Sequence, residues 1–93
     1  MTHVISIIDE DRQSVAMLQP HLQQANFASL QLAEGQYDLE TILQQNPAVI
    51  LMEVSLSGIN GFDLCKTIRL ASNVPIIFIS DKCDEIDRLL AYE

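Results

Sequence analysis

The sequence predicts an α/β protein, built on a doubly wound parallel sheet with helices on both faces. Short apolar runs alternate with segments whose apolar residues recur every three or four positions, and this alternation continues along the chain. The chain has 93 residues, of which 48% are hydrophobic, which suits one small domain with a closed core. Because no repeat, linker or change of composition divides it, we expect residues 1–93 to form a single domain.

Four runs of residues are predicted to be strands. Three of them are apolar almost throughout, which is typical of strands buried on both faces of a parallel sheet. Pro75 falls near the start of the last run, where a strand tolerates the missing amide donor. The predicted strands are 4–8, 27–32, 48–52 and 74–79.

Helices are predicted between and after these strands. Asp11 can cap the first helix, which contains Pro20, and we expect a kink there. Asn46-Pro47 ends the second helix, because a residue that precedes proline disfavours helix, and Asp84 can cap the last one. Strands that alternate with helices in this way pair in parallel through right-handed crossovers. The predicted helices are 11–24, 37–46, 62–71 and a last one from 84, with a loop at 54–61.

The charge of the chain excludes several classes of partner. Five Lys and Arg residues stand against 13 Asp and Glu residues, a formal net charge of −8. We therefore expect no direct nucleic-acid binding by this segment and no attraction to an anionic membrane, since both depend on clustered cations. No apolar run approaches the roughly 20 residues of a membrane span, and the N-terminus lacks the pattern of a secretory signal, so a cytoplasmic location is expected. Cys65 and Cys83 are too far apart for a metal or redox motif.

Acidic and polar residues follow three of the predicted strands, at the points where those strands end. Asp9 and Glu10 follow the first strand, Glu53 ends the third, and Ser80 and Asp81 follow the fourth. Because ligands bind at the carboxyl ends of the strands in open α/β sheets, we expect Asp9, Glu10 and Glu53 to crowd one pocket. Neighbouring carboxylates repel one another unless a cation lies between them, and Mg²⁺ prefers such oxygen ligands.

This cluster suits phosphoryl transfer to a carboxylate, with the ion neutralising charge and Ser80 donating to a phosphoryl oxygen. Structural roles remain open for the single residues. Asp11 alone is a helix cap, and Glu53 alone suits a satisfied structural carboxylate as well as a site residue. The chain contains no phosphate-binding GxxxxGK[ST] loop, no GxGxxG and no GxSxG motif, which excludes the chemistry that those motifs carry.

The arrangement resembles the receiver domain of two-component response regulators, over essentially all 93 residues. In that family an acidic pair follows the first strand, as Asp9-Glu10 does here. The phosphoacceptor ends the third strand, at the position of Glu53, and a segment similar to residues 58–62 follows it. A Ser or Thr ends the fourth strand, here Ser80.

The resemblance implies a flavodoxin-like receiver fold with strand order 2-1-3-4. The family's last strand and last helix would lie beyond residue 93, so a truncated receiver domain is expected. Residues 82–90 are similar to the fourth helix of the subfamily whose receivers precede winged-helix DNA-binding domains. The resemblance therefore implies a module of phosphorelay signalling and transcription regulation, phosphorylated by a histidine kinase, and not an enzyme.

The resemblance also assigns roles to individual residues. Asp9, Glu10 and Glu53 would bind Mg²⁺, together with the backbone carbonyl of Ser55. Glu53 would stand at the phosphoacceptor position, and Ser80 would be the switch hydroxyl that senses the phosphoryl group.

Three residues depart from the family pattern. Glu53 replaces the acceptor aspartate, and its extra methylene moves the carboxylate by about 1.5 Å. A misplacement of about 1 Å can lower the rate of a positioned reaction on the order of 10²-fold. We therefore expect poor or no phosphorylation of Glu53, and a domain that is phosphorylation-independent or phosphomimetic. Asp81 replaces a small residue that controls access to the acceptor, and Ser57 replaces a proline and is expected to loosen its loop.

Two alternatives to this signalling function remain open from the sequence. The first is a metal-dependent site that phosphorylates itself, and the second is a purely structural dimerisation domain whose acids bind no ion. The fourth strand has no successor in this sequence to cover it, and an exposed apolar edge favours association. We therefore expect self-association through the fourth strand and the last helix.

Overall fold

The computed structural model describes residues 3–33 and 35–79 of the chain. The predicted helix from Asp84, together with Ser80 and Asp81, lies outside these residues. The strands are β1 (His3–Ile8), β2 (Phe27–Leu32), β3 (Val49–Glu53), β4 (Ser55–Leu56), β5 (Ile59–Asn60) and β6 (Ile76–Ile79). The helices are α1 (Arg12–Gln24), α2 (Leu39–Gln44) and α3 (Gly61–Arg69).

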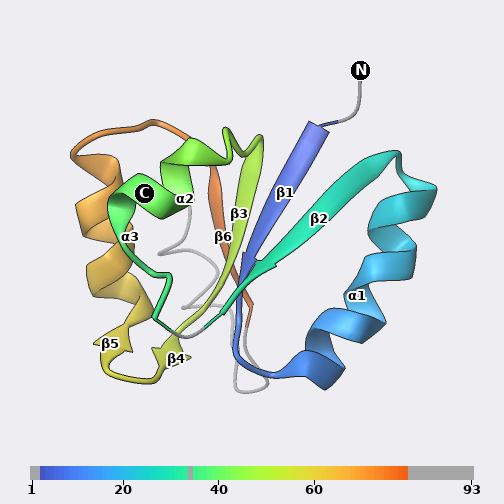
Figure 1. The fold of residues 1–93 in the computed structure, drawn as a ribbon, viewed down its shortest axis with the longest axis horizontal. Coiled ribbons are helices and arrows are strands. Elements are labelled where there is room, and N and C mark those ends of the chain that lie inside the picture. The colour runs from blue at the N-terminus through green and yellow to red at the C-terminus, as the bar shows by residue number, and fades with distance from the viewer. Residues whose placement is uncertain (1–2, 34, 80–93) are drawn as a thin grey trace.

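Four strands form one parallel sheet in the order β2-β1-β3-β6 (Figure 1). The register places Ile7 of β1 beside Leu51 of β3, and Met52 of β3 beside Phe78 of β6. The predicted α/β class, the parallel sheet and the order of its four strands are confirmed. All strands of this sheet end at the same edge, which we call the carboxyl edge.

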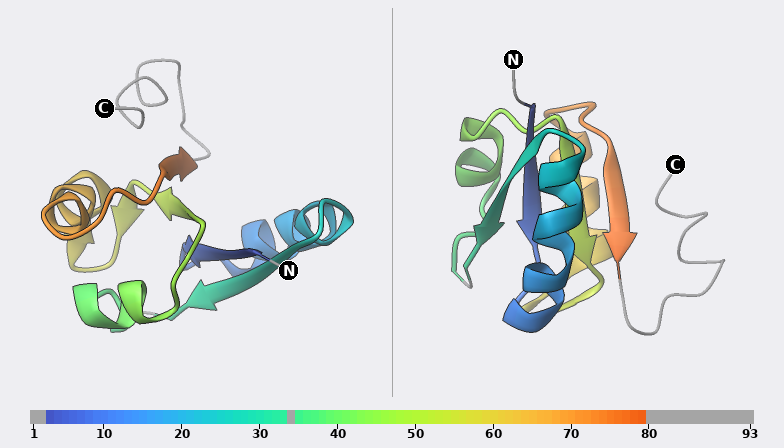
Figure 2. Two further views of the ribbon diagram at one scale, coloured as in Figure 1. Left: turned by 90° about the horizontal axis from the view of Figure 1, so that it is seen from above. Right: turned by 90° about the vertical axis from the view of Figure 1, so that its right-hand side faces the viewer.

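Helix α1 covers one face of the sheet, and helices α2 and α3 cover the other (Figure 2). The sheet separates two hydrophobic clusters. The α1-face cluster has the buried residues Ile5, Ile7, Val15 and Leu51. The α2/α3-face cluster has Ile8, Leu32, Ile42, Ile50, Met52, Leu64, Ile68, Ile76 and Phe78.

Helix α1 begins where the sequence predicts it. The Asp11 carboxylate accepts from the amides of Gln13 (2.9 Å) and Ser14 (3.4 Å), which are donors that the first turn of a helix leaves without an intrahelical partner. Helix α2 is shorter than the predicted 37–46, because it begins only after Asp38, whose carboxylate accepts from the Thr41 amide at 3.0 Å.

The segment 54–61, predicted to be a loop, contains an antiparallel hairpin. Strands β4 and β5 pair across a two-residue turn, Ser57-Gly58. Asn60 then caps α3 by accepting from the Phe62 amide at 2.7 Å. A Cβ atom on Gly61 would lie 2.5 Å from the backbone oxygen of Glu53, so only glycine lets the hairpin return this close to the end of β3.

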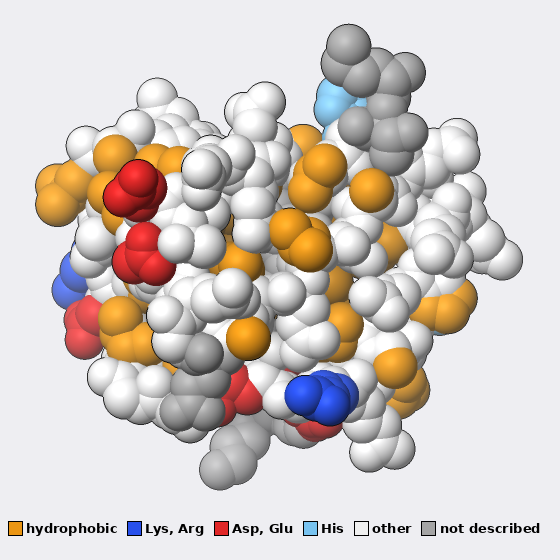
Figure 3. Space-filling view, in the orientation of Figure 1, with side chains coloured by type: hydrophobic (Ala, Val, Ile, Leu, Met, Phe, Trp, Pro, Cys, Tyr) orange, Lys and Arg blue, Asp and Glu red, His pale blue; other side chains and the backbone are white. Residues whose placement is uncertain are grey.

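The surface of the described residues carries apolar side chains on several elements (Figure 3). Met17 of α1 is 70% exposed, and Ile77 of β6, the edge strand of the sheet among the described residues, is 37% exposed. Among residues 3–33 and 35–79, no helix is both long and apolar enough to cross a membrane.

Candidate functional site

Two of the predicted site residues lie side by side at the carboxyl edge. Ile8 pairs with Met52 in the register of β1 and β3, so the next residue of each strand, Asp9 and Glu53, comes at the same level. Asp9 is only 4% exposed. In the orientation of Figure 1 this edge is the lower one, where acidic and basic side chains lie next to each other in the space-filling view (Figure 3).

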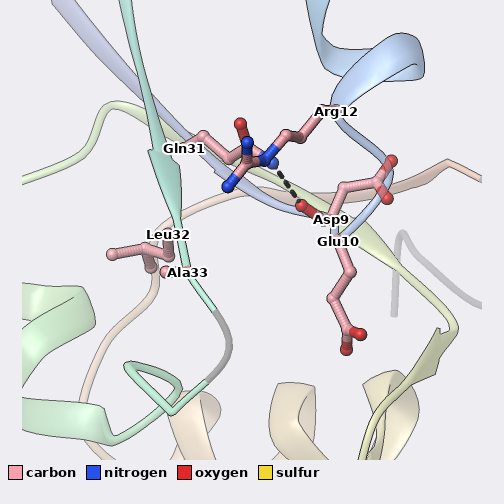
Figure 4. Close-up of a pocket in the computed structure, with 6 residues that line it drawn as sticks. All are labelled: Asp9, Glu10, Arg12, Gln31, Leu32 and Ala33. Carbon is pink, nitrogen blue, oxygen red and sulfur yellow. Dashed lines mark hydrogen bonds between the residues drawn. The ribbon is translucent and has the colours of Figure 1, made fainter.

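Asp9 is fixed by the start of α1 and by the neighbouring strand β2. Its carboxylate Oδ1 accepts from the Asp11 amide at 2.9 Å, which ties it to the start of α1. Its backbone carbonyl accepts from the side-chain amide of Gln31 in β2 at 2.8 Å (Figure 4). These contacts give a buried carboxylate a defined orientation, which a ligand site requires.

The carboxylate of Glu53 turns back onto the chain that follows it. Its Oε1 accepts from the amides of Val54 at 3.0 Å and Ser55 at 3.4 Å. Asp9 and Glu53 together line an open cavity of about 360 Å³ on the α1 face of the sheet. The other lining residues are Ser14, Met17, Leu18, His21 and Ile79.

Glu10 faces the opposite way and is bound by the β4–β5 hairpin. Its Oε1 accepts from the backbone amide of Ser57, and its Oε2 accepts from the Ser57 hydroxyl at 2.6 Å. These two bonds hold the pKa of Glu10 below its ordinary value, and the bond from the Ser57 hydroxyl has a larger effect than the bond from the amide. The carboxylates of Asp9 and Glu10 point away from each other (Figure 4).

The alternation of side chains along a strand explains this divergence. Ile7 belongs to the α1-face cluster and Ile8 to the α2/α3-face cluster. Asp9 and Glu10 continue the same alternation past the end of β1, since successive side chains of an extended chain point to opposite faces. Asp9 therefore reaches the α1 face, and Glu10 reaches the face that carries the hairpin.

A second cavity, of about 450 Å³, opens beside the ends of β1 and β2. Asp9 and Glu10 border it together with a cation, Arg12, and the Gln31 amide (Figure 4). Leu32 and Ala33 complete its lining. Asp9 therefore borders both of these cavities, whereas Glu10 borders this one and is absent from the lining of the cavity shared by Asp9 and Glu53.

The expectation that three carboxylates crowd one pocket is therefore wrong in one respect. Asp9 and Glu53 share a cavity, but Glu10 does not join them. Among the residues that the structure describes, no group of three His, Cys, Asp or Glu side chains could hold a metal ion. Asp9 and Glu53 alone fit Mg²⁺ in donor chemistry, because this ion takes one or two carboxylates together with waters.

Ser57 is the residue whose role the sequence did not reveal. It was expected only to loosen its loop, yet it supplies two donors to a carboxylate 47 positions away. No local motif encodes a contact of that separation. Successive residues of a strand point to opposite faces of the sheet, and this rule could have placed Asp9 and Glu10 on opposite faces from the sequence.

Comparison with known proteins matches residues 5–93 to the family model of the response regulator receiver domain. The transcriptional regulatory protein BaeR of Escherichia coli O6:H1 is 34% identical over 89 residues, covering 96% of this chain and 37% of BaeR. The DNA-binding response regulator MtrA of Mycobacterium tuberculosis is 30% identical over 93 residues, covering 100% of this chain and 41% of MtrA. The chain thus spans about two fifths of the length of these relatives.

Solved structures agree with the family match. The N-terminal domain of the nisin resistance regulator NsrR superimposes with a TM-score of 0.79 at 28% identity, covering 100% of this chain and 82% of that domain. The receiver domain of the response regulator TorR, of the TMAO respiratory system, gives 0.76 at 29% identity, with 96% and 74% covered.

Proposed function

This chain belongs to the response regulator receiver domain family, and on that premise we propose that it signals without phosphorylation of Glu53. Glu53 stands at the position where the family carries its acceptor aspartate. Its carboxylate would carry its negative charge one methylene further out than an aspartate does, towards the point where a phosphoryl group would lie. The domain would then be phosphorylation-independent or imperfectly phosphomimetic.

One observation carries this proposal: the Glu53 carboxylate accepts hydrogen bonds from the two amides that follow it, at 3.0 and 3.4 Å. These bonds turn the carboxylate towards the chain that follows β3, and a reorientation for attack on a phosphodonor would break them. The longer side chain also moves its oxygens by about 1.5 Å relative to an aspartate. Both effects work against the alignment that phosphoryl transfer needs.

We further propose that Mg²⁺ binds weakly at this edge. Asp9 and Glu53 would be its carboxylate ligands, with the backbone carbonyl of Ser55 beside them and Glu10 as a ligand only after a change of orientation. When bound, the ion would neutralise the charge of the two carboxylates. The amide of Asp11 already orients the Asp9 carboxylate for this role.

The relatives suggest what the signal acts on, since BaeR is a transcriptional regulatory protein and MtrA a DNA-binding response regulator. We propose that this domain regulates transcription through a DNA-binding output domain, in the cytoplasm, with a histidine kinase as the family's usual partner. Ser80 would be the switch hydroxyl, and Asp81 would restrict access to Glu53. The exposed Ile77 on the edge strand β6 supports self-association through that strand.

The test is phosphorylation of the purified chain by acetyl phosphate with Mg²⁺, followed by intact-mass measurement. The parent is expected to stay unmodified, and Glu53→Asp to gain one phosphoryl group, because it restores the length of the family's acceptor. Glu40→Asp, the same change on the exposed face of α2, is the matched control and is expected to stay unmodified. A parent adduct that maps to Glu53 would contradict the proposal and favour the self-phosphorylating alternative.

A further inference from the structure

We propose that Ser57 is a positioning residue that withdraws Glu10 from the Asp9–Glu53 cavity. The two hydrogen bonds between Ser57 and Glu10, which we call the Glu10–Ser57 latch, join the turn after β1 to the β4–β5 hairpin. The latch lowers the affinity of this edge for a divalent cation. This inference deepens the proposed function and rests on its metal site.

The latch uses both donors that a serine can offer to one carboxylate. The amide serves one oxygen, and the hydroxyl serves the other at 2.6 Å. Hydrogen bonds to an ionised acceptor are about twice as strong as neutral ones, and a two-pronged contact also fixes orientation. The negative charge of Glu10 is therefore satisfied by protein donors, so that no cation is needed to hold it.

The geometry of the hairpin turn shows what serine contributes at this position. Leu56 pairs with Ile59, so Ser57 and Gly58 are the two central residues of the turn. Gly58 has a φ of +79°, and Ser57 is not among the non-glycine residues with positive φ, which is the φ pattern of a type II turn. Proline is favoured at the first central position of such a turn. A proline there would have neither the amide hydrogen nor the hydroxyl.

The latch and the cavity compete for Glu10 because they lie on opposite faces of the sheet. Asp9 and Glu53 line the cavity on the α1 face, whereas the hairpin packs against the α2/α3-face cluster through Leu56 and Ile59. Glu10 cannot reach Ser57 and the cavity at once. Glu10 can become a third carboxylate ligand only if both hydrogen bonds break. The free energy of breaking them makes the binding of the ion less favourable.

The experiment measures Mn²⁺ affinity by isothermal titration calorimetry on the full chain and on four variants. Ser57→Pro removes both donors and is expected to bind Mn²⁺ about tenfold more tightly than the parent. Ser57→Ala removes only the hydroxyl and should gain about threefold. Ser57→Thr keeps both donors and should match the parent. Thr41→Ala, which removes another hydroxyl bound to a carboxylate (Asp38, 2.8 Å) away from this edge, is the control and should also match it.

NMR of the parent provides a second readout that a merely structural role would not move. The Ser57 amide proton should shift on addition of Mg²⁺ if the ion draws Glu10 out of the latch. Equal Mn²⁺ affinity in all five proteins would overturn the latch while leaving the metal site intact. Absence of binding in every protein would overturn the metal site and the latch together. If Ser57→Pro fails to fold, the difference between the alanine and threonine variants decides the question.

Discussion

The two faces of the sheet are built differently. Among residues 3–33 and 35–79, the α2/α3 face buries nine residues in one cluster and adds the β4–β5 hairpin, whereas the α1 face buries four residues and opens into the Asp9–Glu53 cavity. In this part of the chain the α2/α3 face is therefore the more closely packed one, and the α1 face contains the cavity that Asp9 and Glu53 line. The carboxyl edge is divided in the same way. Glu10 is bound by Ser57 on the packed face, whereas Asp9 and Glu53 line the cavity on the open face.

This comparison teaches that neighbours in sequence can serve separate halves of a site. Asp9 and Glu10 are adjacent, yet strand alternation sends them to different faces. Asp9 and Glu53 are 44 positions apart, yet their strands are hydrogen-bonded neighbours. Which side chains lie close together at the carboxyl edge thus depends on the order of the strands and on the face to which each residue points, more than on spacing along the chain.

The largest expected effect comes from truncating adjacent core residues of β3 that face opposite sides. Ile50 is fully buried in the α2/α3-face cluster, and Leu51 is 9% exposed in the α1-face cluster. We expect Ile50→Ala to lower the free energy of unfolding by about 4 kcal/mol and Leu51→Ala by about 2 kcal/mol, because the open face relaxes around a lost side chain more readily. Urea unfolding followed by circular dichroism measures both.

Each of these variants is the control for the other, since they differ by one position on the same strand. Equal losses would show that the two faces are packed to the same degree. The contrast between a packed face and an open face would then have to be abandoned.

The next largest effect on the free energy of unfolding is expected at Gly61, where the β4–β5 hairpin returns to the end of β3. Gly61→Ala would place a Cβ atom against backbone atoms of Glu53 and Val54, which cannot rotate out of the way. We expect a loss of about 2–3 kcal/mol in unfolding free energy, together with shifts of the Ser57 and Glu10 resonances as the hairpin moves. Gly35→Ala is the comparison: it has open space but a φ of +90°, so its cost of about 1–2 kcal/mol comes from strain alone. A Gly61 variant that leaves the hairpin resonances in place would contradict this account.

The sequence predicted the parts of the fold that periodicity encodes. The apolar runs predicted the four strands of the sheet, and Asp11 predicted the start of α1. The hairpin at residues 55–60 escaped prediction because its strands have two residues each, too short to show any period. The structure shows it through the antiparallel pairing of β4 with β5 and the close return of Gly61 to the end of β3.

The site was predictable in its location but not in its internal orientation. Residues that follow parallel strands meet at one edge, so Asp9 and Glu53 could be placed together. The direction of Glu10 depends on a partner 47 positions away, and that partner was interpreted as a loosened loop residue. Tertiary hydrogen bonds of this kind leave no periodic trace in a sequence.

The smallest expected effect compares the helix caps on the two faces and depends on pH. Asp11 caps α1 through two amides and the Ser14 hydroxyl, whereas Asp38 caps α2 through the amide and hydroxyl of Thr41. Hydrogen bonds from Ser14 and Gln13 lower the pKa of Asp11, and those from Thr41 lower the pKa of Asp38, in both cases from an ordinary value of 3.8. Both carboxylates are therefore more acidic in the folded chain than in the unfolded one.

A carboxyl group with a lowered folded pKa stabilises the fold fully above its unfolded value, and this contribution disappears as the pH falls through the folded value. Asp11→Ala and Asp38→Ala should therefore destabilise the chain at pH 7 and lose most of that effect below the folded pKa. Asp11→Ala should lower the free energy of unfolding more than Asp38→Ala does, because Asp11 accepts from one more backbone amide and caps a longer helix. Urea midpoints measured from pH 7 down to pH 2.5 test this order. A cost that stays constant across that range would mean that packing around the caps, and not their charge, stabilises the two helices.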